Sequence, residues 1–234
     1  PDLVVVPIGG GGLISGIVSA AMNVSPETRI VGVQAAACPS AYEAVMTGQI
    51  TQVKGRSSIA DGISVKKVGQ ITFDIIQKGV DDIVMADEEQ IAAAILLLLE
   101  REKILAEGAG AAPLAALMNG SIKIPQEGKT ILVISGGNVD SPLLGRIISQ
   151  GLSLHGRVMR VGVRMADVPG SLSNLLRLIA GTKANVLHIY HDRNVRGIPL
   201  YVTHVELELE TRGPAHVKEI TDTLQSAGYD IRLP

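Results

Sequence analysis

The chain has 234 residues, a length typical of one or two domains. Hydrophobic residues make up 46% of it and charged residues 19%, which excludes an intrinsically disordered chain, because enough apolar side chains are present to form a core. Lys and Arg number 21 against 23 Asp and Glu, and aromatic residues make up 2%, so neither nucleic acid nor an acidic membrane surface is an expected partner.

The chain contains no recognisable targeting or membrane-spanning segment. Residues 3–26 carry no charge, but Pro7 and the glycines at 9–12 interrupt any helix that could cross a bilayer, and no basic segment precedes them as in a signal peptide. The single cysteine, Cys38, excludes an internal disulfide and fits a reducing compartment, so we expect a cytoplasmic protein. A strand-like run begins almost at the first residue, and we expect the natural start to lie upstream.

Up to about residue 153, short β-branched runs alternate with longer helical stretches, which is typical of parallel strands covered by helices. Helices are expected at 13–22 and 88–105, and Asp87 and Gln90 have the spacing of a capping box at the start of the second. Residues 91–99 are apolar on every side, which predicts burial between layers. Strands are expected at 3–6, 29–34, 82–86 and 130–135. This part is predicted to be an α/β structure.

From residue 157 the predicted order is strand, helix, strand, strand, helix, strand. In the strands at 158–165 and 200–210, the odd-numbered residues from Met159 and from Tyr201 onward form an apolar face, and histidine and glutamates alternate with them in the second. A helix over 214–227, closed by Gly228, leads into a last strand. This order is that of the split-βαβ, ferredoxin-like fold. We therefore predict two domains, 1–153 and a smaller α+β domain at 157–234.

Four consecutive glycines follow the first predicted strand: Gly9, Gly10, Gly11 and Gly12, with the next helix starting at Leu13. Such a loop leaves successive backbone N–H groups unobstructed, and the start of the helix adds partial positive charge, so the segment predicts a phosphate site. The glycine spacing matches neither the dinucleotide fingerprint nor the P-loop. A tight turn that needs glycine for packing explains one or two of the four glycines but not readily all of them.

A second glycine turn, Ser135-Gly136-Gly137-Asn138, follows the strand predicted at 130–135. Open α/β sheets bind ligands at the carboxyl ends of their strands, and a serine hydroxyl there can donate a hydrogen bond to a neutral ring nitrogen. Taken alone, the turn is better explained as an ordinary connection between a strand and a helix. Together with the glycine loop it indicates a binding site.

Four segments in chain order resemble the threonine/serine dehydratases, which are pyridoxal-phosphate enzymes related in fold to the tryptophan synthase β subunit. The segments are residues 7–16 (PIGGGGLISG), 59–62 (IADG), 107–111 (EGAGA) and 135–138 (SGGN). The resemblance implies pyridoxal phosphate as cofactor, with its phosphate at Gly9 to Leu13 and its pyridine nitrogen facing Ser135, and it places Glu107 near the site. It also implies deamination of threonine or serine to a 2-oxo acid and ammonia. A neutral serine partner favours elimination, because it leaves the ring less electron-withdrawing than an aspartate would.

The Schiff-base lysine of that family belongs to a Ser-Phe-Lys-type motif that this chain lacks. The lysines of the first part have polar or helix-like surroundings and are interpreted as solvated surface charges. They are Lys54, Lys66, Lys67, Lys78, Lys103, Lys123 and Lys129. We therefore expect the chain to be the C-terminal portion of a dehydratase. This portion is expected to contain no catalytic residue and to be inactive by itself.

No metal site is predicted. Some relatives bind a divalent cation through acidic residues after the strand that corresponds to 29–34, but this chain has Gln34, Cys38 and Ser40 there, which suit a hard cation poorly. The odd spacing of His188 and His191 directs them to opposite faces of a strand, so they are interpreted as ordinary histidines. Cys38 is expected to be packed, because no base partner for a nucleophile is evident.

Residues 166–172 (ADVPGSL) resemble the ligand-binding turn of ACT domains, and the resemblance extends over about 157–234. It implies an amino-acid effector bound by Asp167, by the backbone at Gly170 near a helix start, and by Asn185 at the start of the next strand. Isoleucine, valine or a nucleotide is the effector in such families, and isoleucine biosynthesis is one role of these enzymes. The alternative is an ordinary turn in a module that only forms dimers. A homodimer or homotetramer is implied in both cases.

Two other functions stay open from the sequence. One is a stand-alone amino-acid-binding or dimerisation module whose α/β part does not catalyse. The other is a serine racemase-like enzyme of the same fold, against which the ACT-like tail argues. A lysine motif in the upstream coding sequence would favour an enzyme.

Overall fold

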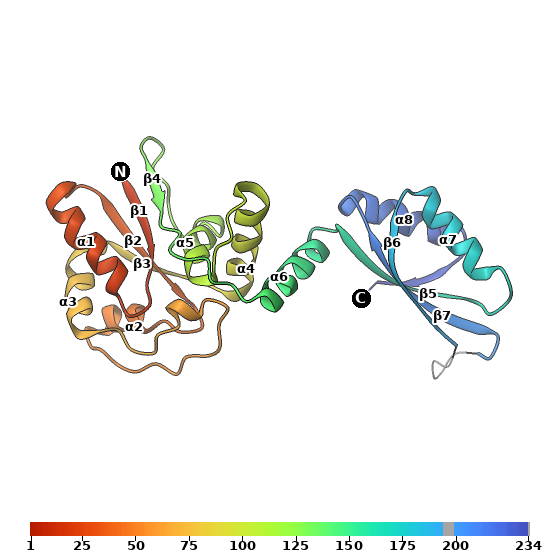
Figure 1. Ribbon diagram of the computed structural model, residues 1–234, viewed down its shortest axis with the longest axis horizontal. Coiled ribbons are helices and arrows are strands. Elements are labelled where there is room, and N and C mark those ends of the chain that lie inside the picture. The colour runs from red at the N-terminus through yellow and green to blue at the C-terminus, as the bar shows by residue number, and fades with distance from the viewer. Residues whose placement is uncertain (194–198, 234) are drawn as a thin grey trace. The chain divides into compact units, whose positions relative to one another are not determined.

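The computed structural model describes residues 1–193 and 199–233, and the chain divides into two compact units, Pro1–Ile147 and Ile148–Pro234 (Figure 1). The division falls inside helix α6 (Ser141–Leu154), whereas the domain division predicted from the sequence follows that helix. No helix in the described part of the chain is both long and apolar enough to span a bilayer.

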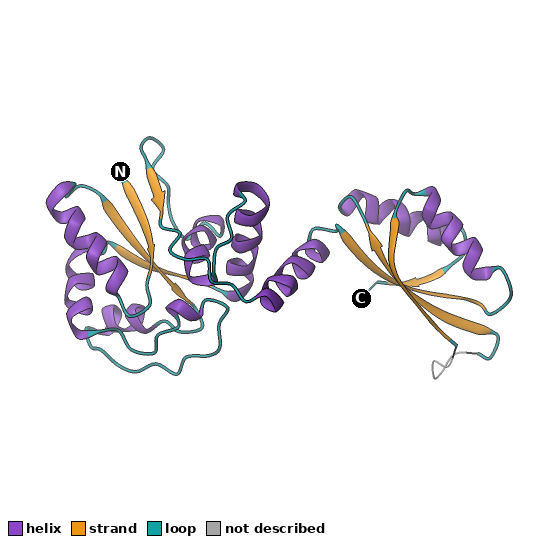
Figure 2. Cartoon of the chain, viewed as in Figure 1, coloured by secondary structure: helices purple, strands orange, loops and turns teal. Residues whose placement is uncertain are grey.

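The first unit contains a four-stranded parallel sheet in the order β3-β2-β1-β4 (Figures 1 and 2). Its strands are β1 (Leu3–Pro7), β2 (Arg29–Ala35), β3 (Asp82–Ala86) and β4 (Thr130–Leu132). In the central pair, Leu3 lies opposite Arg29, and on the other side of β1 it lies opposite Thr130. The predicted α/β class is confirmed, and so are the positions of β1, β2 and β3.

The fourth strand departs from the prediction of a buried strand over 130–135. It ends at Leu132, and Ile131 is 46% exposed. The reason is its position, because β4 lies at the edge of the sheet and pairs with β1 alone among the described strands. An edge strand has a partner on one side only, so the pairing that would extend and bury it is missing.

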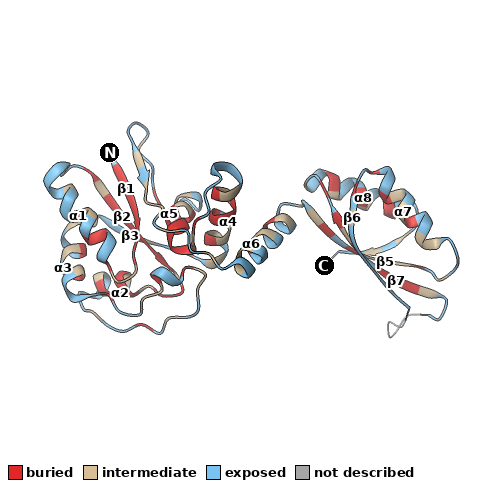
Figure 3. Cartoon of the chain, viewed as in Figure 1, coloured by how far each residue is buried: buried red, intermediate tan, exposed pale blue. Residues whose placement is uncertain are grey.

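Helices cover both faces of this sheet. Alternate β1 residues, Val4 and Val6, pack with Ile14, Val18 and Ile76 on one face, and α5 contacts β1, β2 and β3 on the other. The helices are α1 (Gly12–Val24), α2 (Ser40–Thr47), α3 (Gln70–Gly79), α4 (Glu88–Leu97) and α5 (Gly108–Met118), with a 3-10 turn η1 (Asp61–Ile63) and a π-helical segment η2 (Leu98–Glu102). Figure 3 shows the resulting buried layer along the strands and inner helix faces.

Helix α4 begins as the sequence predicts and ends earlier. Asp87 accepts a hydrogen bond from the Gln90 N–H at 2.8 Å, and Gln90 Oε1 accepts one from the Asp87 N–H at 3.0 Å, so the capping box is confirmed. The α-helix ends at Leu97, and the π-helical turn stops at Lys103, which has a positive φ of 60°. Most of the apolar run is buried, but Ala93 is exposed, which corrects the prediction of burial on every side.

The second unit has the βαββαβ order that the sequence predicts. Its elements are β5 (Val158–Ala166), α7 (Ser171–Gly181), β6 (Asn185–Asp192), β7 (Val202–Glu210), α8 (Pro214–Ser226) and β8 (Asp230–Arg232). The strands form an antiparallel sheet in the order β6-β7-β5-β8, the arrangement of a ferredoxin-like fold. The inward faces of β5 and β7 pack against Leu175, Ile179, Ile220 and Leu224 of the two helices. Tyr201 was predicted to share the buried face but is 83% exposed, because β7 begins only at Val202.

A buried histidine joins the two helices of this unit. His216 is 4% exposed; its Nε2 lies 2.8 Å from the Thr182 carbonyl oxygen at the end of α7, and its Nδ1 accepts a hydrogen bond from the Arg212 N–H at 3.1 Å. A carbonyl can only accept and an N–H can only donate, so Nε2 donates to Thr182 and Nδ1 accepts from Arg212. Both ring nitrogens therefore pair with backbone groups, and Thr182 is itself buried.

We expect His216→Ala to lower the free energy of unfolding of the second unit by about 2–3 kcal/mol, because it leaves a carbonyl and an N–H unpaired and removes packed volume. Urea denaturation followed by circular dichroism measures the change. His191→Ala, which changes an exposed histidine on β6, is the control and should stay within about 0.5 kcal/mol of the original. Equal unfolding midpoints for the two variants would contradict the structural role of His216.

Candidate functional site

The glycine loop connects β1 to α1 at the carboxyl edge of the sheet, and packing accounts for two of its glycines. Gly11 is the N-cap of α1 and has a φ of +95°, and a Cβ there would lie 2.7 Å from the Thr72 side chain. At Gly9 a Cβ would lie 2.9 Å from the Gly62 carbonyl oxygen. A side chain at either position would disturb the loop without any ligand being involved.

Packing does not explain the other two glycines. A Cβ at Gly12 would have no described atom within 4 Å, and one at Gly10 would only reach Val65, at 4.0 Å. Both residues instead border a cavity of about 180 Å³, which we call the glycine-loop cavity. It is lined by Pro7, Gly9, Gly10, Gly11, Gly12, Leu13, Gly62, Ile63, Glu107, Ala109 and Ser135. A Cβ at Gly12 would occupy space that the protein itself leaves open.

The cavity is suited to an anion. The first N–H groups of α1 have no acceptor within the helix, and Gly11 offers no side chain to cap them. The aligned peptide dipoles add partial positive charge at the same end. No lysine or arginine of the described residues lines the cavity, and the seven lysines of the first unit are all exposed, as the sequence predicts. An anion bound here would be held by neutral main-chain donors.

The four segments that the sequence analysis singled out meet around this cavity. β1 and β4 are neighbours in the sheet, so the loops after them lie side by side. The Glu107 N–H donates to the Gly136 carbonyl oxygen at 3.0 Å. A Cβ at Gly110 would lie 3.0 Å from that same oxygen and 3.2 Å from the Ser135 nitrogen, so glycine allows the start of α5 to approach the second glycine turn. Gly62 completes the wall beside Gly9.

Ser135 and Glu107 are the polar side chains on the cavity wall. The Ser135 hydroxyl is exposed and forms no hydrogen bond with any described residue, so it is available to a ligand. Glu107 is half-buried, and its carboxylate lies near Gly62 and Gly136. The family resemblance implies that Glu107 lies near the site, and the structure puts it in the lining. Nothing in the sequence indicates Ile63, an apolar residue with no motif of its own.

A second cavity, of about 270 Å³, shares Glu107 with the first. Its remaining polar lining comes from Ser58, Asp61, Asn138 and Asp140. Asp61 and Asn138 belong to segments that the sequence analysis quoted, whereas Ser58 and Asp140 carried no signal. Their position follows from the fold, which brings the loop before η1 against the loop before α6.

The residues considered for a metal have structural roles. Gln34 is buried, and its Oε1 accepts hydrogen bonds from the N–H groups of Ala41 and Tyr42, both at 2.9 Å. Cys38 is packed, and burial raises the pKa of its thiol, which disfavours the reactive thiolate. Ser40 donates to the Val65 carbonyl at 2.5 Å. Among the residues that the structure describes, no three His, Cys, Asp or Glu side chains cluster as metal ligands would.

The residues predicted to bind an effector occupy two ends of the second unit. Asp167 forms an ion pair with Arg193 at 3.1 Å, and nearby Gly170 caps α7 with a φ of +92° and open space around it. Asn185 donates to Glu210 at 3.3 Å, at the opposite end of the sheet. The length of β7 separates the two ends by roughly 25 Å. One chain therefore brings Asp167 and Gly170 together but not Asn185.

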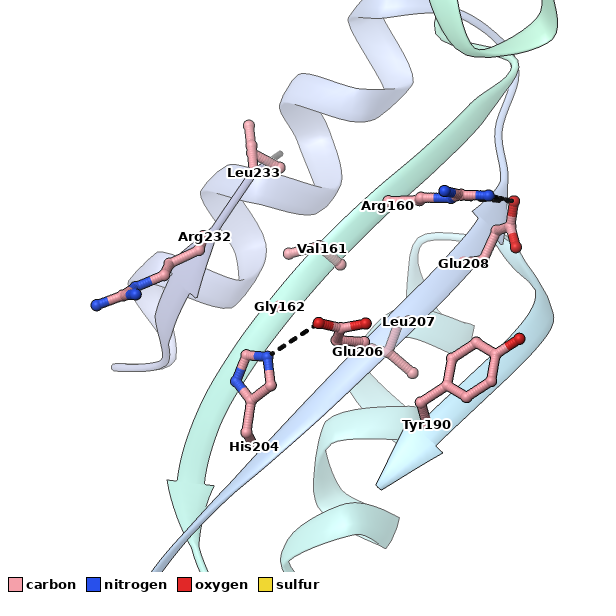
Figure 4. A pocket seen from close by; sticks show the side chains of 10 residues that line it. All are labelled: Arg160, Val161, Gly162, Tyr190, His204, Glu206, Leu207, Glu208, Arg232 and Leu233. Carbon is pink, nitrogen blue, oxygen red and sulfur yellow. Dashed lines mark hydrogen bonds and ion pairs between the residues drawn. The ribbon is translucent and has the colours of Figure 1, made fainter. Parts of the chain in front are cut away.

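The face of this sheet that the helices leave uncovered contains a cavity of about 530 Å³ (Figure 4). Arg160 pairs with Glu208 at 3.3 Å, and His204 pairs with Glu206 at 3.5 Å and lies over Gly162, where a Cβ would meet the imidazole at 2.8 Å. The predicted effector residues do not line it. The alternating pattern of β7 predicts this charged face but not that it is hollowed.

Comparisons with known proteins show which family the chain resembles. The family described as "Pyridoxal-phosphate dependent enzyme" matches residues 1–136. L-Threonine ammonia-lyase of Geobacter sulfurreducens is 47% identical over 231 residues, which are 98% of this chain and 57% of that protein. This chain thus spans little more than half the length of that curated relative, and the similarity extends through the second unit.

Solved structures resemble the chain over a smaller part. The T.th. threonine deaminase has a TM-score of 0.57 at 36% identity, covering 60% of this chain and 51% of that one. Maize serine racemase has a TM-score of 0.58 at 31% identity, covering 66% and 48%. The matched family covers more than half of the chain and includes the loops that build the glycine-loop cavity. The chain therefore belongs to the family of pyridoxal-phosphate dependent enzymes.

Proposed function

We propose that this chain is part of a threonine ammonia-lyase, which converts L-threonine to 2-oxobutanoate and L-serine to pyruvate, with release of ammonia. The observation that carries the proposal is the glycine-loop cavity, because it unites the segments that resemble this enzyme class and includes two glycines that packing leaves unexplained. The identity to L-threonine ammonia-lyase supports the choice of substrate.

The residues present fit the cofactor. Its phosphate would bind the main-chain N–H groups of Gly9 to Leu13 at the start of α1, where Gly12 leaves room for it. The Ser135 hydroxyl would donate to the pyridine nitrogen without adding charge. When bound, pyridoxal phosphate supplies an electron-withdrawing ring that makes the α-proton of an amino acid acidic. The neutral Ser135 moderates this effect, which favours loss of the β-hydroxyl over a long-lived carbanion.

We expect Gly12→Ala to weaken pyridoxal phosphate binding by the complete protein about tenfold, equivalent to ~1.4 kcal/mol, because Gly12 lines the cavity and the added methyl group would compete with the phosphate for space that the protein leaves open. Equilibrium dialysis measures the dissociation constant. Gly16→Ala is the matched control, since it lies one turn further along α1, also has open space, and does not line the cavity. Equal loss of affinity in both variants would place the phosphate elsewhere.

The Schiff-base lysine is proposed to lie outside these 234 residues, which makes the chain inactive by itself. Support comes from the lining of the glycine-loop cavity, in which no lysine of the described residues occurs. The exposure of every lysine in the first unit supports it as well. The residues of this chain would hold and orient the cofactor while another part of the protein attaches it covalently.

Borohydride reduction of the complete, cofactor-loaded protein tests this assignment. Reduction makes a lysine-bound cofactor permanent, and peptide mass spectrometry then locates it. We expect the modified lysine in a peptide outside this chain. A modified Lys54, Lys66 or any other lysine of the sequence shown would refute the assignment.

We further propose that the second unit is an ACT-type regulatory domain that binds an amino-acid effector such as isoleucine or valine. The ferredoxin-like order and the similarity of the whole unit to L-threonine ammonia-lyase support this. Asp167 and Gly170 would bind the ammonium and carboxylate groups. Because Asn185 lies at the other end of the sheet, a site using all three residues needs a second copy of the chain, consistent with a homo-oligomer. The alternative function for the whole chain is an amino-acid-binding or dimerisation module without catalysis.

The serine racemase alternative rests on the similarity to the maize enzyme. Assays of the complete protein with L-threonine and L-serine separate the functions. We expect 2-oxobutanoate and ammonia from threonine, and a rate that changes when isoleucine or valine is added. Formation of D-serine faster than pyruvate would favour the racemase, and absence of any product with loaded cofactor would favour the module without catalysis.

A further inference from the structure

The loop between α2 and η1 leads into one wall of the glycine-loop cavity. From residue 51 to residue 60 it contains no helix or strand. Its last residues lie between the glycine loop and the start of α5, because the Gly62 carbonyl packs against Gly9 and the backbone of Ile59 and Ala60 packs against Gly108. The loop therefore positions η1, whose Gly62 and Ile63 line the cavity.

The hydrogen bonds at residues 58–62 are local with one exception. Ala60 N–H donates to Ser58 Oγ at 3.0 Å, Gly62 N–H to Asp61 Oδ1 at 2.8 Å, and Ile63 N–H to the Ala60 carbonyl at 3.1 Å. These bonds shape the loop but do not fix it to the rest of the protein. Among the described residues, the exception is the Ile59 N–H, which donates to Glu88 Oε2 at 2.7 Å.

Glu88 is well placed to act as an anchor. It is the first residue of α4, directly after the capping residue Asp87, so its backbone is held by a well-formed helix start. The positive end of the helix dipole stabilises a carboxylate there. A hydrogen bond to a charged acceptor is stronger than one between neutral groups.

The second oxygen of this carboxylate is less well satisfied than the first. Glu88 Oε1 is buried and has no hydrogen-bond partner among the described residues. Burying a charged oxygen without a partner costs free energy, and an exposed position would avoid that cost. Natural proteins accept such local costs mainly at functional sites.

We infer that Glu88 is a positioning residue for the cofactor phosphate: by holding the Ile59 N–H it fixes residues 59–62 against Gly9 and Gly108 and so keeps the glycine-loop cavity in its binding shape. The inference rests on the proposed function, because it takes pyridoxal phosphate as the ligand. The Arg56 N–H donates to the Ala37 carbonyl at 2.9 Å, so without Glu88 it is the segment after Arg56 that has to be ordered when the phosphate binds, and the ordering cost weakens binding.

The test uses the complete protein with three substitutions. Glu88→Ala removes the acceptor. Glu88→Gln keeps an oxygen that can accept the hydrogen bond from the Ile59 N–H. Its amide nitrogen takes the place of Oε1, the oxygen that has no partner among the described residues. Glu89→Ala removes the same charge from the neighbouring, exposed position on α4 and is the matched control. Should Glu88→Ala not fold, Glu88→Asp, which withdraws the carboxylate by one methylene group, takes its place.

Two measurements separate positioning from general stability. Equilibrium dialysis gives the dissociation constant of pyridoxal phosphate, and urea denaturation gives the unfolding midpoint without cofactor. We expect the dissociation constant to rise about tenfold in Glu88→Ala and to stay within about threefold of the original in Glu88→Gln and Glu89→Ala. Glu88→Ala and Glu88→Gln are both expected to shift the unfolding midpoint, but only Glu88→Ala is expected to weaken cofactor binding. A change in stability alone would therefore not explain the loss of affinity.

Unchanged affinity in Glu88→Ala would overturn the inference. Equal weakening in the Ala and Gln variants would overturn it as well, because the acceptor would then not be what matters. If the unsubstituted complete protein does not bind pyridoxal phosphate, the proposed function fails, and this inference fails with it. Binding by the unsubstituted protein together with full binding by Glu88→Ala leaves the proposed function standing and removes only the role of Glu88.

Discussion

The site depends on one physical arrangement, in which main-chain N–H groups at the start of a helix face a cavity that no described side chain fills. Neutral donors can hold an anion without a lysine or arginine, and the aligned peptide dipoles strengthen them. The glycines of the loop serve this arrangement in different ways. Gly9 and Gly11 let the backbone take its path, while Gly10 and Gly12 leave the donors accessible. A loop built for its turn alone would need only the first pair.

Close backbone contact between distant segments is what forms the cavity around those donors. The start of α5 approaches the second glycine turn through Gly110, and the loop before η1 approaches α5 through Gly108. Side chains at these positions would push the segments apart, because a Cβ at Gly108 would collide with the Ile59 carbonyl oxygen and one at Gly110 would lie 3.0 Å from that of Gly136. The sheet order contributes equally, because β1 and β4 are adjacent parallel strands and their carboxyl ends open on the same edge. The glycines at the close contacts and the order of strands in the sheet therefore both contribute to the glycine-loop cavity.

The sequence predicts the parts of this site better than their surroundings. Glycine runs, the strand before the first of them and a capping box are local signals, and each is found where it was predicted, whereas the strand before the second glycine turn ends early. The short exposed β4 could not be predicted, since a strand's place at the edge of a sheet is a property of topology. The same holds for Tyr201. It continues the alternating apolar pattern of β7, but the strand begins only at the next residue. Glu88 was also missed, because a carboxylate in a helix's first turn has an ordinary explanation until its long-range partner is known.

In the second unit, one chain brings together only part of the predicted effector site. Asp167 and Gly170 lie beside each other because both belong to the turn after β5. Asn185 opens β6, and antiparallel pairing with β7 carries it to the end of the sheet where β7 finishes. No rotation of side chains spans that distance. An amino acid that contacts all three must therefore lie between two copies of the chain, so effector binding and association of the copies would be thermodynamically linked. A ligand at such a position would stabilise the assembled form over the separate chains, because it binds only where two copies meet.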